Sequence, residues 1–211
     1  MNVVTRSIEL PEVLAHAMRD RQVGHAVITK ALPDDIGPSP RAAANALWHL
    51  DEATRQLTVR STLPLDWSIL GSAQSIDTSP TYSAGDRLHL DLSLDCQFTP
   101  PADVPPELRQ VVKSGGRCYR SRRVTVPEER RTSWLIGKLA ARGFEVDAAS
   151  LTMSSVLSAD LGRRGGAIPY VDISCDGTVT DADAFTKAVA EGVGKGKNFG
   201  LGLVRVASAI H

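Results

Sequence analysis

The five histidines are the side chains of this sequence best suited to acid–base chemistry near neutral pH, because an imidazole ordinarily titrates at a pKa of ~6.5. They are His16, His25, His49, His89 and His211. No HxxxH pair and no accompanying carboxylate pattern gives two of them the spacing of metal ligands. His49 and His89 alternate with apolar residues, which is typical of strand positions that are packed or solvated. The sequence therefore predicts no metal site.

A second unusual segment, Gly192 to Leu203, combines glycines with lysines. Its glycines allow positive φ and close backbone approach, and its successive N–H groups could form a nest for an anion. A Walker A motif is excluded because Asn198 follows Lys197, and a dinucleotide fingerprint is excluded because this loop leaves a helix and enters a strand. An anion-binding loop and a purely structural helix end both remain open. The residues concerned are Gly192, Gly194, Lys195, Gly196, Lys197, Gly200 and Gly202.

The net charge is zero, but its distribution is uneven. Residues 1–95 carry 8 basic and 12 acidic side chains, a formal charge of −4, whereas residues 96–211 carry 16 and 12, a charge of +4. No acid occurs between Glu107 and Glu128. Such a strip can guide a polyanion even on a neutral protein, although a solvated basic linker is the alternative. The strip comprises Arg109, Lys113, Arg117, Arg120, Arg122 and Arg123.

Composition indicates an ordinary globular protein, with 42% hydrophobic and 23% charged residues. No signal peptide is evident at the N-terminus and no run of 18 apolar residues occurs, so we expect a cytoplasmic protein without a membrane partner. The three cysteines, Cys96, Cys118 and Cys175, form no CxxC pair, and we expect inert thiols.

The elements that must position these residues fall into two similar series. Apolar alternation predicts a strand over 3–10, and helical spacing follows from Pro11 to Met18. Asp20 could cap a helix over 21–32. Further strands are expected over 46–50, 56–61 and 87–94, with a loop or single helical turn over 64–70.

The second half repeats this order after a proline-rich and glycine-rich stretch. A short strand is expected over 122–126, followed by a helix over 128–141 with Gly143 at its C′ position and by strands over 145–157 and 168–175. A turn is expected at Asp176-Gly177, then a helix up to about Glu191 and a last strand over 201–206. Two βαββαβ units in tandem make this an α+β chain with two ferredoxin-like (RRM-like) domains. The expected divisions are 1–96, a linker or basic loop at 97–120, and 121–211.

Several motifs together resemble one family. A helix running into G-x-G-K-G-K-x-F-G-x-G-L resembles the signature of the RAMP superfamily of CRISPR-associated proteins. Leu47 to Glu52 (LWHLDE), Pro64 to Ser68 (PLDWS) and the helix from Pro127 to Phe144 are similar to segments of its CasE subfamily, in the same order. The resemblance covers nearly the whole chain. It implies tandem ferredoxin-like domains and metal-independent cleavage of CRISPR repeat RNA hairpins, without a cofactor.

In the resembling family, a histidine in the helix after the first strand takes the proton from a ribose 2′-OH, and His25 occupies that place. The 2′-oxygen then attacks the phosphodiester and leaves a 2′,3′-cyclic phosphate. Lys30 is the nearest cation that follows His25 in the chain, but it lies ~140° around the helix. Many relatives carry a tyrosine three residues before this histidine, where this chain has Gln22, which can hydrogen-bond but cannot transfer a proton at a useful pKa. The proton donor is therefore left open.

The resemblance also implies that basic residues of the second domain hold the RNA stem through its phosphates, and that the protein stays on its guide RNA as a subunit of the type I-E surveillance complex (Cascade). The candidates are Arg117, Arg120, Arg122, Arg123, Arg163, Arg164, Lys195 and Lys197. A non-cleaving RNA-binding scaffold is the alternative, and Gln22 favours it. A phosphate-ligand enzyme built on the glycine loop is a third, remote reading, since neither nucleotide motif fits. The repeat sequence, the cleavage rate, the oligomeric state and the docking surface are not specified.

Overall fold

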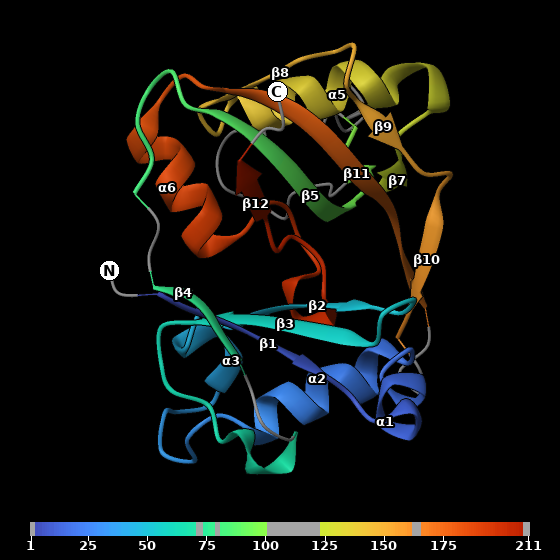
Figure 1. Cartoon of the computed structure of the whole chain (residues 1–211). Helices are drawn as coiled ribbons and strands as arrows, with labels where there is room; N and C mark the ends of the chain where they lie inside the picture. Colours follow the sequence, from blue (N-terminus) through green and yellow to red (C-terminus); the bar gives the residue numbers. More distant parts are fainter. Residues whose placement is uncertain (1–2, 71–73, 79–80, 101–122, 162–165, 209–211) are drawn as a thin grey trace, which may run out of the picture.

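A computed structural model describes residues 3–70, 74–78, 81–100, 123–161 and 166–208. The chain forms two antiparallel sheets, one from each half, with a small two-stranded ladder between β6 (Gln97–Phe98) and β7 (Val124–Thr125). The helices of the first half lie on the side of their sheet that points away from the second sheet (Figure 1). The expected tandem ferredoxin-like fold is confirmed.

The first sheet has the order β2-β3-β1-β4, from β1 (Val4–Glu9), β2 (Leu47–Asp51), β3 (Gln56–Ser61) and β4 (Gln74–Thr78). Between β1 and β2 come α1 (Glu12–Ala17), α2 (Arg21–Lys30) and α3 (Pro40–Ala43), and η1 (Trp67–Ile69) precedes β4. Alternate strand residues such as Trp48, Leu50 and Leu57 are buried against Met18 and Ile28. This core fixes α2 against the sheet.

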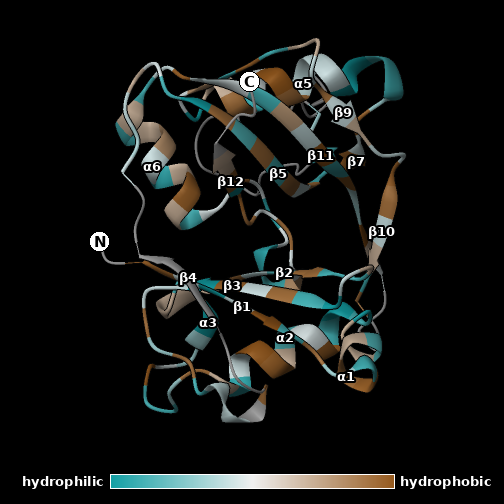
Figure 2. Cartoon of the chain, viewed as in Figure 1, coloured by the Kyte–Doolittle hydropathy of each residue, from teal (hydrophilic) through white to brown (hydrophobic). Residues whose placement is uncertain are grey.

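The second sheet has the order β10-β11-β5-β12, and β8 and β9 also pair with β11. Its strands are β5 (Arg87–Asp95), β8 (Phe144–Val146), β9 (Thr152–Met153), β10 (Leu157–Asp160), β11 (Ala167–Val179) and β12 (Arg205–Ser208). Helices α5 (Glu128–Ala140) and α6 (Ala182–Glu191) pack on one face, where Leu135, Phe185 and Leu92 are buried together. Hydrophobic and hydrophilic residues alternate along β5 and β11, as a sheet with one buried face requires (Figure 2).

One strand belongs to a different sheet from the one expected. Residues 87–94 were predicted to complete the first domain, but β5 pairs with β11 and β12 at the centre of the second sheet. The fourth strand of the first sheet is β4, which the sequence pattern did not reveal. The two sheets therefore divide between β4 and β5, not at residue 96. Alternation alone cannot specify a strand's partner, because both sheets need a strand with one buried face.

Three local expectations in the second half were also wrong. Asp176-Gly177 is not a turn, because β11 runs through it and Gly177 pairs with both Val146 and Leu88. A Cβ at Gly177 would come within 2.3 Å of the Glu145 carbonyl oxygen, so glycine at this position allows β8 to lie close to β11. The strand expected over 145–157 is broken into short pieces, and the last strand begins only at Arg205.

Two polar side chains of the first domain, the buried Arg60 and the half-buried Asn45, join it to the second domain. Arg60 of β3 is 7% exposed, and its Nη1 donates to the carbonyl oxygens of Val189 (2.8 Å) and Val204 (2.9 Å) at the ends of α6 and of the glycine loop. Nδ2 of Asn45 donates to the Ala190 carbonyl at 2.8 Å. The end of α6 is therefore held directly on the first domain.

Candidate active site

His25 lies in the second turn of α2, the helix that Asp20 caps by accepting the Gln22 N–H at 2.8 Å. The imidazole is half-buried. Oγ1 of Thr29, one turn further on, lies 3.5 Å from Nδ1 of His25. The ring of Phe199, from the second half of the chain, meets the imidazole edge-on at a centroid distance of 6.0 Å. The predicted base and the predicted glycine loop are therefore neighbours.

Trp48 joins α2 to the glycine loop. A Cβ at Gly24 would lie 2.3 Å from Cη2 of this buried indole, and a Cβ at Gly200 would lie 2.9 Å from Cζ3. The indole Nε1 donates to the carbonyl of Asn198 at 3.1 Å. The LWHLDE segment and the glycine loop, far apart in sequence, thus build one structure around His25.

All five glycines of the loop have φ between 75° and 82°, a region that side chains disfavour. The loop closes on itself where the Val193 N–H donates to the Gly202 carbonyl at 2.9 Å, and a Cβ at Gly202 would lie 2.3 Å from the Val193 oxygen. The Gly202 N–H donates to the Ser93 carbonyl of β5 at 2.7 Å. The glycines are therefore required by the backbone path itself.

The anion held by this loop is part of the protein. Oδ1 of Asp95, a side chain only 1% exposed, accepts the Lys195 N–H at 2.7 Å, and a Cβ at Gly194 would lie 2.5 Å from the same oxygen. Arg123 Nη2 lies 2.5 Å from Oδ2, and Lys138 Nζ lies 3.9 Å from Oδ1. The Asp95 carboxylate thus occupies the place that sequence reasoning offered to an external anion.

The lysines of the loop differ in their surroundings. Nζ of Lys197 donates to the Glu191 carbonyl at 2.5 Å at the end of α6, and burial lowers the pKa of Lys197. Lys195 is exposed. Of the two, Lys195 is therefore the one whose ammonium faces solvent.

The other expected site residues are placed as follows. Gln22 lies half-buried in the first turn of α2, and Lys30 is exposed in the last turn. Arg123 pairs with Asp95 as described. The remaining predicted RNA-binding residues, Arg117, Arg120, Arg122, Arg163 and Arg164, lie outside the described residues.

A tyrosine from the second domain reaches the start of α2. The hydroxyl of Tyr170, on β11, lies 3.5 Å from Nη2 of Arg21, and the Arg21 guanidinium lies over the rings of both Tyr170 (5.8 Å) and Trp48 (5.7 Å). The sequence alone gave no role to Tyr170 or to Arg21. No sequence signal joins residues 149 positions apart.

Two absences concern the described part of the chain only. Among these residues, no cluster of three or more histidine, cysteine, aspartate or glutamate side chains could hold a metal ion. None of the helices described is long and apolar enough to cross a membrane.

Cys96 and Cys175 are buried free thiols, and burial raises the pKa of Cys175 to about 12.

The sequence resemblance implied tandem ferredoxin-like domains and a histidine on the helix after the first strand, and the structure places that histidine beside the glycine-rich loop. Residues 6–208 match the family model described as CRISPR associated protein. The chain therefore belongs to the CRISPR-associated protein family. No curated protein matches it in sequence.

Solved structures of several family members resemble the chain over its whole length. A structure of "CRISPR endoribonuclease Cse3 bound to 19 nt RNA" has 20% identity and a TM-score of 0.74, and covers 98% of each chain. Thermus thermophilus Cse3 bound to an RNA representing a pre-cleavage complex matches equally well at 20% and 0.74, over 98% of this chain and 100% of that one. Cas6e from Escherichia coli K-12 gives 20% and 0.60, over 99% and 100%. At these identities the likeness shows the fold.

Proposed function

We propose that this protein is an endoribonuclease that cleaves CRISPR repeat hairpins in precursor RNA and remains bound to the product. The observation that carries the proposal is the packing of the His25 helix on the glycine loop, through Trp48 and Phe199. Family membership over residues 6–208 and the likeness to RNA-bound Cse3 support it. The RNA, in this proposal, crosses the exposed edge of His25 with its stem on the second domain.

The reaction needs no metal in this proposal. Nε2 of His25 takes the proton from the ribose 2′-OH, the 2′-oxygen forms a bond to phosphorus, and the bond from phosphorus to the 5′-oxygen breaks. The products are a 2′,3′-cyclic phosphate and a 5′-OH, so atoms and charges balance once the leaving oxygen gains a proton. Thr29 supports the choice of Nε2, because its Oγ1 lies beside Nδ1 and can accept the Nδ1 proton.

The stem is held by positive charge of the second domain, since A-form RNA offers its phosphates more readily than its base edges. We assign this role to Lys195 and to five arginines that lie outside the described residues. Arg123 and Lys197 support the loop rather than the RNA, because Asp95 and the end of α6 engage them. The arginines are Arg117, Arg120, Arg122, Arg163 and Arg164.

The test uses end-labelled repeat RNA from the host CRISPR locus, incubated with purified protein in EDTA. We expect cutting at one site, with a cyclic phosphate on the 5′ fragment. His25→Ala protein and an RNA with 2′-deoxyribose at the cut should each abolish the cut. Cleavage that requires added Mg²⁺, or that persists on the 2′-deoxy RNA, overturns the mechanism.

One observation favours a second function, that of a non-cleaving RNA-binding subunit. Gln22 stands where many relatives carry tyrosine, and an amide cannot deliver a proton to the leaving oxygen. Tight binding of the repeat RNA by the wild-type protein, without cutting, would establish this alternative.

With or without cleavage, we propose that the protein serves as a cytoplasmic subunit of a surveillance complex. A similar fold occurs in a structure described as "CRISPR RNA-guided surveillance complex" (18% identity, TM-score 0.58, covering 99% of this chain and 100% of that one).

A further inference from the structure

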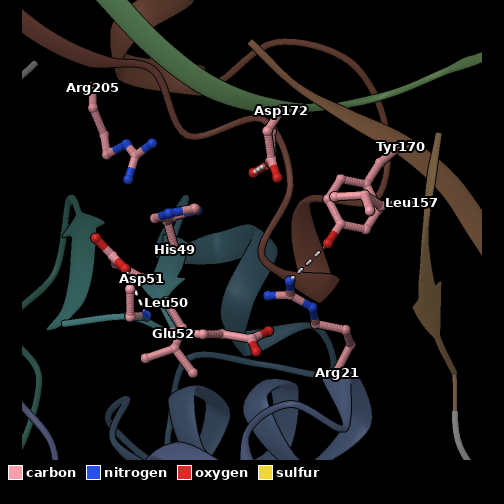
Figure 3. Close-up of a pocket in the computed structure, with 11 residues that line it drawn as sticks. Arg21, His49, Leu50, Asp51, Glu52, Leu157, Tyr170, Asp172 and Arg205 are labelled. Atoms are coloured by element: carbon pink, nitrogen blue, oxygen red, sulfur yellow. Dashed lines mark hydrogen bonds between the residues drawn. The ribbon is translucent and has the colours of Figure 1, made fainter. Parts of the chain in front are cut away.

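A pocket of about 570 Å³ lies between the two domains, beside the start of α2. Figure 3 shows His49 at its centre, with Arg205 on one side and Tyr170 and Arg21 on the other. The first domain contributes α2, β2 and the turn after β2, and the second contributes β5, β10, β11 and β12. The polar lining comprises Arg21, His49, Asp51, Glu52, Ser93, Tyr170, Asp172 and Arg205.

The three carboxylates of this pocket are already engaged within the protein. Oδ1 of Asp51 accepts the N–H groups of Ala53 (2.9 Å) and Thr54 (3.2 Å) in the turn. Glu52 pairs with Nε of Arg19 at 3.1 Å, and Asp172 accepts the Ser93 hydroxyl. Each acid therefore has its own donor, and within the described part of the chain neither Arg21 nor Arg205 forms an ion pair with a carboxylate.

The two arginines are less well satisfied. Arg205 Nε is buried and has no hydrogen-bond partner, and no ion pair to Arg205 occurs among the described residues. Arg21 is 6% exposed, and the hydrogen bond that its guanidinium donates to Tyr170 is long at 3.5 Å. A buried donor without an acceptor is costly, so an acceptor supplied by a ligand would be stabilised here.

The two arginines also act on His49, whose side chain lines the same pocket. Burial, followed by the charges of Arg205 and Arg21, lowers its pKa to about 3, and Asp51 opposes the shift only weakly. The imidazole is therefore neutral at physiological pH and able to donate one hydrogen bond. Beside its three engaged carboxylates, the pocket thus offers two arginines and one neutral hydrogen-bond donor.

We infer that this pocket binds a backbone phosphate of the single-stranded RNA that flanks the cleaved phosphodiester. The inference rests on the proposed function and adds a second RNA contact to it. Arg21 and His25 are four residues apart on α2, so they share one face with a rise of ~6 Å between them. An RNA strand that passes His25 can therefore continue past Arg21 to Arg205. Arginine is well suited to such a contact, because its guanidinium donates two parallel hydrogen bonds to phosphate.

The first arm of the test follows His49 by NMR in protein labelled at histidine, with His49→Gln used to assign its signals. We expect a non-cleavable repeat RNA, with 2′-deoxyribose at the cut and single-stranded flanks, to shift the His49 signals and raise the imidazole pKa. The hairpin without flanks should leave them unchanged. Unchanged signals at saturation with the flanked RNA would overturn the inference. Inorganic phosphate is tested in the same way. If phosphate shifts the His49 signals and the flanked RNA does not displace it, the pocket is a site for a free anion and the inference is overturned too.

The second arm measures affinity for the same flanked RNA across a salt series. Arg205→Gln should weaken binding and reduce the slope of log K against log[salt] by about 0.7, the value for one single-strand phosphate. Lys187→Gln removes the same charge from the exposed side of α6 and should leave the affinity and the salt slope unchanged. An unaltered slope for Arg205→Gln, with wild-type protein that still cleaves, removes this pocket from the interface and leaves the nuclease assignment intact. Failure of the wild-type protein to bind any repeat RNA removes the nuclease assignment itself.

Discussion

Gly24 and Trp48 are in such close contact that the helix carrying His25 has no room for a Cβ at position 24, since one would lie 2.3 Å from the indole Cη2. The same indole touches the glycine loop at Gly200 and donates to Asn198. The position of His25 relative to Phe199 therefore depends on glycine at residue 24. The distance between the His25 helix and the glycine loop is fixed because one tryptophan packs against both.

Gly24→Ala should disrupt this contact. Overpacking of a buried contact typically costs about 1–3 kcal/mol, and the displaced helix should also slow cleavage. The measurement is urea unfolding, followed by single-turnover cleavage under conditions where the variant is folded. Gly137→Ala on α5 is the matched control, because nothing lies within 4 Å of a Cβ there and alanine favours the helix. Equal stability of the two variants would show that α2 can move away from Trp48 without cost.

Thr29 should set the proton arrangement of His25. Thr29→Val keeps the shape but removes the acceptor beside Nδ1, whereas Thr29→Ser keeps the hydroxyl. We expect Thr29→Val to slow single-turnover cleavage up to about tenfold, the value of a net hydrogen bond, with RNA affinity unchanged. Thr29→Ser should cleave at nearly the wild-type rate. Equal rates for the two variants would remove Thr29 from the mechanism.

Asp95 should matter for folding more than for RNA binding. Asp95→Ala leaves the Lys195 N–H and the Arg123 guanidinium without their buried partner, and loss of one member of a buried pair costs roughly 3 kcal/mol. Chemical denaturation measures this directly. Glu145→Gln also removes one negative charge, but at an exposed position, and its free energy of unfolding should stay within about 0.5 kcal/mol of wild type. If Asp95→Ala were instead as stable as wild type, the glycine loop would not depend on its internal anion.

Much of this arrangement follows from local sequence, and some of it does not. The Asp20 cap and the start of α2 were correctly predicted, and α5 ends at Ala140, one residue before its predicted end, with Gly143 at positive φ just beyond it. Each of these features depends on residues within a few positions. The sheet of β5 was not correctly predicted, because pairing with β11 is decided by contacts some 80 residues away. Gly177 looked like a turn, although its role is to let Phe144 and Glu145 lie close to β11.

The candidate site divides in the same way. His25 and the glycine loop were found from residue type and resemblance, and the structure brings them together through Phe199. Arg21 and Tyr170 were missed because only the packing of two domains places them side by side. An anion-binding loop was one of two interpretations left open by the sequence, and the contact with Asp95, 100 residues earlier, could not be predicted from it.

Stability should fall with acid through His49. Its pKa is about 3 in the folded protein and 6.5 in the unfolded chain, so the unfolded state binds more protons between these values. The stabilisation from a neutral His49 is fully present above pH 6.5 and is lost progressively as the pH falls toward 3. His49→Gln should therefore show a shallower loss of unfolding free energy over this window. His16→Gln, at an exposed position of α1, should keep the wild-type slope, and a His49→Gln curve parallel to wild type would contradict the burial of a neutral imidazole.

The central claim, that the imidazole of His25 removes the 2′-OH proton, is tested most directly by chemical rescue. Single-turnover cleavage of repeat RNA by His25→Ala protein should be slower by roughly 10²–10⁴-fold, with RNA affinity retained. Added imidazole should restore part of the rate, in proportion to the concentration of its neutral form as the pH is varied. A His25→Ala protein that cleaves at the wild-type rate would contradict the claim. A slow His25→Ala protein whose rate does not respond to added imidazole would contradict it too. The Thr29→Ser protein serves as the control in that experiment, because it keeps the hydroxyl and should cleave normally.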